Sequence, residues 1–328
     1  MTRLIDSLLN ERFLKSLAGP LIEILKHDEV LVIDNVARYY FQHRDEFINQ
    51  DVSKSYPNIA PPFENFFMEF KVPSFILQPG EKRPDTAKIL GVHFSAFEKD
   101  DFFEAMQVLS DPENGISRQM KIIAESSSDF PDLKWFLVCQ PFYEKFNGRA
   151  GFRYSKFVFP VDEDGCLSKN ADGKEQFSTV MDLEYLLSRG VTYEKAVEMR
   201  EMESAAIVNI IFPCLLALSF MHCKNVVLSA PVRSYPPGQK KNEKLPSITY
   251  RMLDIEPMKT VLRTEGNSEK TGLKQALSIC RGHFKDYREH GLFGKNKGLY
   301  WWDSHVRGSH TEGIVIKDYV VKSPKAQA

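Results

Sequence analysis

Cysteine is scarce in this chain of 328 residues. The five cysteines, at Cys139, Cys166, Cys214, Cys223 and Cys280, are widely spaced and form no CxxC pair. An odd number at wide spacing argues against a disulfide framework and a cysteine-rich zinc site, and it is typical of a reducing compartment. The N-terminal stretch MTRLIDSLLNERFLKS is charged throughout and lacks the apolar segment of a signal peptide. We therefore expect a cytoplasmic protein.

The short motifs of nucleotide-binding and hydrolase sites are also missing. The chain contains no P-loop, no GxGxxG, no GxSxG and no HExxH. Four of the eight histidines gather near the C-terminus, at His283, His290, His305 and His310. None of them shows tight zinc-ligand spacing, and few carboxylates are nearby. We expect neither a metal nor a cofactor.

One long apolar run raises the question of a membrane span. Residues 205–223 read AAIVNIIFPCLLALSFMHC, about the length that crosses a bilayer. The run is interrupted by Asn209, Pro213, Ser219 and His222, and its N-terminal flank is acidic. We interpret it as part of a buried core helix over residues 192–222, kinked at Pro213, and expect no membrane contact.

Charge is divided unevenly along the chain, although the net charge is only −1. Residues 221–328 hold 19 Lys or Arg and 10 Asp or Glu, a net of +9; the totals of 43 and 44 leave 24 and 34 for residues 1–220, a net of −10. Such a split favours a nucleic-acid face in the basic part. It is equally explained if the acidic part docks on the basic part.

The periodicity of apolar residues predicts an α+β fold. The first 50 residues follow a helical pattern, with Gly19-Pro20 as a break. Aromatic and β-branched runs then predict strands, which form a mixed, largely antiparallel sheet. These predicted strands are 63–72, 89–97, 135–142, 152–161, 248–255, 277–287, 299–307 and 314–321.

The proline-rich stretch at 231–246 (PVRSYPPGQKKNEKLP) predicts a connector. It separates an acidic α+β region at 1–230, which has a helical N-terminus and contains the buried helix, from a basic region at 247–328, which forms a C-terminal antiparallel β-unit. A single continuous domain is the alternative, because the buried helix can tie both parts together.

The C-terminal region holds the residues best suited to chemistry. In a strand over 277–287, Arg281, His283, Lys285 and Tyr287 share one face, since side chains alternate. In a second strand over 299–307, Trp301, Asp303, His305 and Arg307 share a face. If the strands pair through a hairpin at 290–298, one surface carries arginines, histidines, a lysine and a tyrosine, provided that the register joins those faces.

Such a surface suits a phosphate ester. Arg281, Lys285 and Arg307 would hold phosphate oxygens. The histidines His283 and His305, assisted by Tyr287, would exchange protons. The aromatic residues Tyr300, Trp301 and Trp302 would stack on bases. The same side chains also have a plain interpretation: the tryptophans pack in the core, and the histidines are ordinary hydrogen-bonded residues.

Several of these residues lie in a signature. The segments Cys280-Arg-Gly-His-Phe, Leu292-Phe-Gly-Lys, Gly298-Leu-Tyr-Trp-Trp and His305-Val-Arg-Gly together resemble the C-terminal motif of an uncharacterised family of bacterial and phage proteins. The segment Cys223-Lys-Asn-Val is similar to a second element of that family, and 62–70 more faintly to another. The resemblance covers mainly the last third of the chain. It implies a bacterial or phage origin and a cytoplasmic setting, and it brings no activity or catalytic residue.

Two hypotheses of function from different classes follow from the residues, and a small-molecule phosphoester or nucleotide site on the same surface is a third possibility. In the first, the chain binds RNA or DNA, and in the more specific form it is a metal-independent ribonuclease, since the RNA 2′-hydroxyl can supply the nucleophile. In the second, it is a non-catalytic module of a phage or mobile element that interacts with proteins or regulates them. The sequence leaves open whether the protein is an enzyme, and it predicts no oligomeric state.

Overall fold

The computed structural model describes residues 4–10, 25, 29–77, 86–108, 115–153, 155–181, 186–187, 190–228, 232–234, 248–255, 276–280, 282–291, 296–302, 305–307 and 309–314. Its contacts divide the chain into two units. The N-terminal unit comprises Met1–His222 and Leu228–Leu253, and the C-terminal unit comprises Cys223–Val227 and Asp254–Ala328. The expected α+β class is confirmed: helices accompany a mixed, mostly antiparallel sheet.

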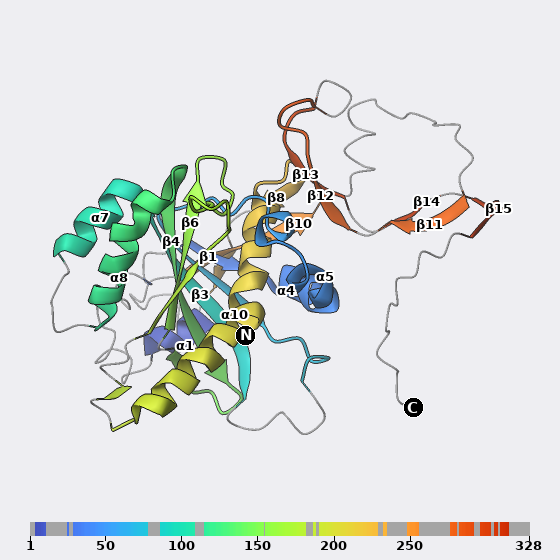
Figure 1. Ribbon diagram of the computed structural model, residues 1–328. Coiled ribbons are helices and arrows are strands. Elements are labelled where there is room, and N and C mark those ends of the chain that lie inside the picture. The colour runs from blue at the N-terminus through green and yellow to red at the C-terminus, as the bar shows by residue number, and fades with distance from the viewer. Residues whose placement is uncertain are drawn as a thin grey trace. The chain divides into compact units, whose positions relative to one another are not determined.

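A ten-stranded sheet forms the centre of the fold (Figure 1). Its strands are β1 (Glu29–Val32), β2 (Asn65–Lys71), β3 (Ala87–Glu98), β4 (Leu133–Lys145), β5 (Ala150–Phe152), β6 (Ser155–Asp162), β7 (Ser178–Met181), β8 (Val226–Leu228), β9 (Val232–Ser234) and β10 (Ile248–Ile255). The order is β7-β6-β4-β3-β2-β1-β10-β8, with β5 beside β4 and β9 beside β10. The central strands β2 to β4 are buried on both faces, which explains their nearly continuous aromatic and aliphatic runs.

Helices cover both faces of this sheet. They are α1 (Leu4–Asn10), α4 (Asp34–Gln42), α5 (Arg44–Ile48), α6 (Val52–Ser55), α7 (Lys99–Val108), α8 (Gly115–Glu125), the 3₁₀ turn η1 (Ser126–Asp129) and α10 (Tyr193–Met221). One apolar cluster joins α1 to Phe67 and Phe142, and another joins α7 and α8 to Phe136 and Val158. On the opposite face α4 packs on β2, where the ring of Phe41 contacts that of Phe70.

The expectation that the first 50 residues are helical is wrong at β1. Residues 29–32 form a short strand whose register is parallel to both β2 and β10. Val30, Leu31 and Val32 are all buried. A fully buried run of four residues shows no alternation of apolar and polar side chains, so its sequence does not distinguish a strand from a helix. The prediction from the sequence therefore includes residues 29–32 in the helical pattern that follows them.

The prediction of one long buried helix is confirmed by α10. Thr192 caps its N-terminus, where the side-chain hydroxyl accepts a hydrogen bond from the Lys195 N–H over 3.3 Å. The helix continues through Pro213 to Met221 and crosses one side of the sheet (Figure 1). By length and composition it could span a membrane, but 80% of its most apolar window is buried within the protein, as in a core helix.

Five short strands after β10 lie among the described residues of the C-terminal unit. They are β11 (Ala276–Cys280), β12 (His283–Asp286), β13 (Leu299–Trp302), β14 (His305–Arg307) and β15 (Ser309–Ile314). The predicted strands 277–287 and 299–307 therefore each form two pieces. Strand β12 pairs with β13, and β11 lies between β14 and β15. Of the predicted strand 314–321, residues 315–321 lie outside the described residues.

The expected connector at 231–246 begins with strand β9, which pairs with β10. Most of β10, up to Leu253, belongs with the N-terminal unit, and the short segment Cys223–Val227 belongs with the C-terminal one. The division of the chain at 231–246 into two regions stays a prediction.

Candidate functional site

The hairpin of β12 and β13 carries most of the residues selected from the sequence. Its antiparallel register pairs His283 with Trp302, Phe284 with Trp301 and Lys285 with Tyr300. Directly paired residues share a face of the ribbon, so odd positions of β12 lie with even positions of β13. The expected surface, in which Trp301 joins His283 and Lys285, is therefore wrong: Trp302 takes that place.

A cation and an aromatic ring meet on this face. The Lys285 ammonium group lies 4.8 Å from the centroid of the Trp302 ring. Both side chains are partly exposed, and His283, directly opposite Trp302, is exposed. A cation–π contact at such a site contributes about 0.5–1 kcal/mol. The face thus presents to solvent an indole ring, an ammonium group and an imidazole.

The other face of the hairpin is packed inside the C-terminal unit. Trp301 is 2% exposed, and its ring meets that of Phe284 edge to face at 4.8 Å. Tyr300 is paired with Lys285 and so lies on the same face as Lys285, but it is only 5% exposed and contacts the ring of Tyr287. Rings buried in this way offer no face to a base. We therefore remove Tyr300 and Trp301 from the predicted stacking residues and keep Trp302.

The segment Cys223–Val227 holds β13 in place. The Asn225 side chain donates to the Trp301 carbonyl over 2.9 Å and accepts from the Trp301 N–H over 3.0 Å. The Lys224 N–H donates to the Leu299 carbonyl over 2.9 Å. The two sequence elements quoted for the resemblance, Cys223-Lys-Asn-Val and Gly298-Leu-Tyr-Trp-Trp, thus lie against each other. No local pattern in the sequence predicts this role of Asn225.

Gly298 is required by this close approach. Its φ is +142°, and a Cβ at this position would lie 2.8 Å from Cγ of Lys224. The Gly298 carbonyl accepts the N–H of Tyr287 over 2.9 Å, which closes the ladder beyond β12. Tyr287, predicted as a catalytic assistant, is therefore a partly exposed residue at the end of the hairpin ladder.

An ion pair stiffens the turn after β12. The Arg288 guanidinium donates to both carboxylate oxygens of Asp286, at 2.6–3.1 Å. These hydrogen bonds lower the pKa of Asp286 below its ordinary value. Because the pair is exposed, its contribution to folding is small.

The predicted pair of catalytic histidines is not brought together by the register. His283 lies in β12, paired with Trp302, whereas His305 lies in β14, paired with Cys280. The two belong to different sheets of the C-terminal unit. Arg307 pairs along the backbone with Ser278. Arg281 lies outside the described residues.

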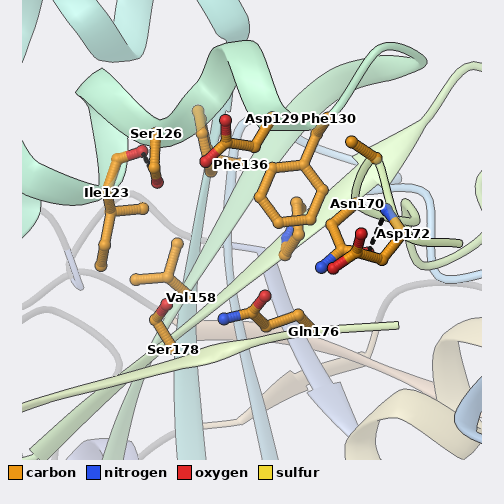
Figure 2. Close-up of a pocket in the computed structure, with 12 residues that line it drawn as sticks. Ile123, Ser126, Asp129, Phe130, Phe136, Val158, Asn170, Asp172, Gln176 and Ser178 are labelled. Atoms are coloured by element: carbon orange, nitrogen blue, oxygen red, sulfur yellow. Dashed lines mark hydrogen bonds between the residues drawn. The ribbon is translucent and has the colours of Figure 1, made fainter. Parts of the chain in front are cut away.

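A separate concave site lies in the N-terminal unit (Figure 2). It is a cavity of about 310 Å³ with an apolar floor of Phe136 and Val158 on the sheet and the ring of Phe130 above it. Asp129 and Asp172 both line it, and none of the described lining residues is a lysine, arginine or histidine. Such a lining repels phosphates, so this cavity does not suit a nucleotide.

Asp172 lies in a turn that is held by hydrogen bonds to the Asn170 side chain. The side-chain oxygen of Asn170 accepts the N–H groups of Asp172 and Lys174, and Gly173 takes a φ of +75°. The sequence indicated a turn-rich stretch here but no cavity, because the floor and the walls come from distant segments.

Comparisons with known proteins give no further guidance. No protein-family model matches the chain, and neither the curated proteins nor the solved structures contain a match. The resemblance to a bacterial and phage family stays a prediction. Among the described residues, no group of three or more metal-ligating side chains gathers.

Proposed function

We propose that the β12–β13 hairpin binds single-stranded nucleic acid. The observation that carries the proposal is the Lys285 ammonium group over the Trp302 ring, both of which are partly exposed. A base stacks on an indole whatever its sequence, and a neighbouring cation attracts the phosphate attached to that base. The exposed imidazole of His283 adds a hydrogen-bonding group beside the same ring.

The charge of the surrounding sequence supports this proposal. Between positions 281 and 302 there are five lysines or arginines and two acidic residues. Asp286 and Arg288 form an ion pair that adds no net charge, so the excess of three positive charges comes from the other residues. Phosphate contacts of this kind supply most of the affinity of non-specific nucleic-acid binding.

The proposal is limited to binding. A ribonuclease that works without a metal needs two proton-transferring groups, one on each side of the scissile phosphate. His283 pairs with Trp302 and His305 pairs with Cys280, so the two histidines are not cross-strand partners in this register. We assign the hairpin the roles of holding phosphate and stacking a base, through Lys285 and Trp302.

The test is binding of labelled RNA and DNA single strands of about 12 nucleotides, followed by fluorescence anisotropy over a series of salt concentrations. Lys285→Gln should weaken binding about three- to tenfold. It should also make the slope of log affinity against log salt shallower by about 1, the contribution of one phosphate contact. Trp302→Leu keeps an apolar side chain but removes the ring, and it should weaken binding about tenfold at every salt concentration.

Lys174→Gln is the matched control, because it removes one exposed lysine from the N-terminal unit. It should leave both the affinity and the salt slope unchanged. Absence of binding at low salt, or equal losses in Lys285→Gln and Lys174→Gln, would refute the proposal and favour the alternative of a protein-interaction module. A preference between the RNA and the DNA strand would show whether the 2′-hydroxyl is read.

A further inference from the structure

A second groove, in the N-terminal unit, combines aromatic rings with carboxylates. It has a volume of about 630 Å³ and lies where β3 passes into α7. Its lining consists of two prolines, three aromatic residues, three acidic residues and one alanine: Pro61, Pro62, Phe63, Glu64, Ala96, Phe97, Glu98, Asp101 and Trp135. None of these described lining residues is basic. Aromatic faces and carboxylates together form the lining that proteins use for organic cations.

A lysine next to this groove, Lys134, contacts two of the lining residues without being part of the lining. The Lys134 Nζ is 3.7 Å from a carboxylate oxygen of Glu98 and 5.9 Å from the centroid of the Trp135 ring. Glu98 and Trp135 are direct cross-strand partners in β3 and β4. Two residues of the lining, Glu98 and Trp135, therefore already contact an ammonium group.

A β-bulge accounts for the position of Lys134. Neighbouring residues of a regular strand point to opposite faces, so Lys134 and Trp135 would normally diverge. The register between β4 and β6 shifts between Leu133 and Trp135, which makes Lys134 the extra residue. Bulges re-aim side chains in this way and are common beside functional sites.

We propose that this groove binds the lysine side chain of a partner peptide, whose ammonium group replaces that of Lys134 between Glu98 and Trp135. A peptide, rather than a small enclosed ligand, fits because the groove is open and its acidic residues Glu64, Glu98 and Asp101 are exposed. This acidic surface is complementary to a basic segment. The inference does not depend on the function proposed for the hairpin.

Lys134 is held weakly enough to be displaced. Its side chain is 40% exposed and that of Glu98 is 59% exposed. Exposed pairs of this kind contribute about 0.2–1 kcal/mol. The internal lysine thus acts as a competitor that a peptide lysine can replace.

The competition gives substitutions with opposite effects. The probe is a short glycine-flanked peptide with one lysine, titrated into the full-length protein, and the readout is the NMR signal of the Trp135 indole N–H. Lys134→Gln removes the competitor and should tighten binding about threefold, whereas Glu98→Gln should weaken it about threefold. Lys121→Gln removes an exposed lysine from α8 and should change nothing.

The same peptide with an acetylated lysine tests whether binding depends on the positive charge of the lysine or only on the shape of its side chain. It keeps the side-chain length but has no positive charge, and it should leave the Trp135 signal unmoved. The proposal is overturned if the acetylated peptide binds equally well, if neither peptide moves the Trp135 signal, or if Lys134→Gln weakens binding as Glu98→Gln does. The last result would mean that the Lys134–Glu98 pair only supports the local structure.

Discussion

Gly91 lies where helix α1 meets the sheet, and the absence of a side chain there is a packing requirement. A Cβ at this position would lie 2.6 Å from Cζ of Phe67 and 2.7 Å from Cδ2 of Leu4. Both neighbours are buried. Since a well-packed core cannot move apart without cost, the smallest residue is needed at this point.

Gly91→Ala should therefore lower the free energy of unfolding by about 1–3 kcal/mol, because it overpacks the contact. Urea denaturation followed by circular dichroism measures the change. The double variant with Phe67→Leu, which trims the ring, should lose less stability than the sum of the two single variants. Strict additivity would show that the strain is not relieved at Phe67.

At the scale of the element, the hairpin depends on a segment that is distant in sequence. Both the NH₂ group and the oxygen of the Asn225 side-chain amide form hydrogen bonds with the backbone of Trp301, 76 residues further along the chain. Asn225 itself is 1% exposed. A short two-stranded ribbon is marginal by itself, so this clamp is a main reason why β13 holds its position.

Asn225→Ala should destabilise the β12–β13 hairpin by about 1–3 kcal/mol, since it removes both hydrogen bonds that the Asn225 side chain makes with the buried Trp301 backbone. Hydrogen exchange of the Trp301 amide should become faster. Asn225→Asp keeps the acceptor for that N–H and loses only the donor, so its exchange should be slower than in Asn225→Ala. Equal exchange in the wild type and Asn225→Ala would show that the clamp is dispensable.

At the scale of the whole molecule, α10 supplies many of the buried apolar side chains in the core of the N-terminal unit. Leu215, Leu216 and Leu218 are fully buried. The helix lies across the sheet and contacts α4, where the hydroxyl of Tyr40 donates to the Val208 carbonyl over 2.7 Å. Its apolar surface thus faces protein.

Leu216→Asn should destabilise the entire N-terminal unit by more than about 3 kcal/mol, because it removes buried apolar contacts and leaves an amide without partners. Thermal unfolding followed by near-ultraviolet circular dichroism detects the loss. Tyr193→Asn, at the exposed start of the same helix, is the control and should stay close to the wild type. An unchanged melting temperature in Leu216→Asn would contradict a core role for α10.

The sequence by itself determined the elements whose signals are local. The long helix could be predicted because a threonine cap precedes it and the apolar run within it exceeds any strand. The strands β2 to β4 and the hairpin in the C-terminal unit could be predicted from aromatic runs and turn residues. These properties depend only on neighbours in the chain.

Only the tertiary structure decided which side chains meet. The alternation of a strand repeats every two residues and contains no information about register, so Trp302 rather than Trp301 joined Lys285. The parallel placement of β1, the clamp of Asn225 and the bulge that turns Lys134 toward Trp135 all depend on partners distant in sequence. Pairing between distant segments is fixed by the packing of the whole fold, which no local pattern encodes.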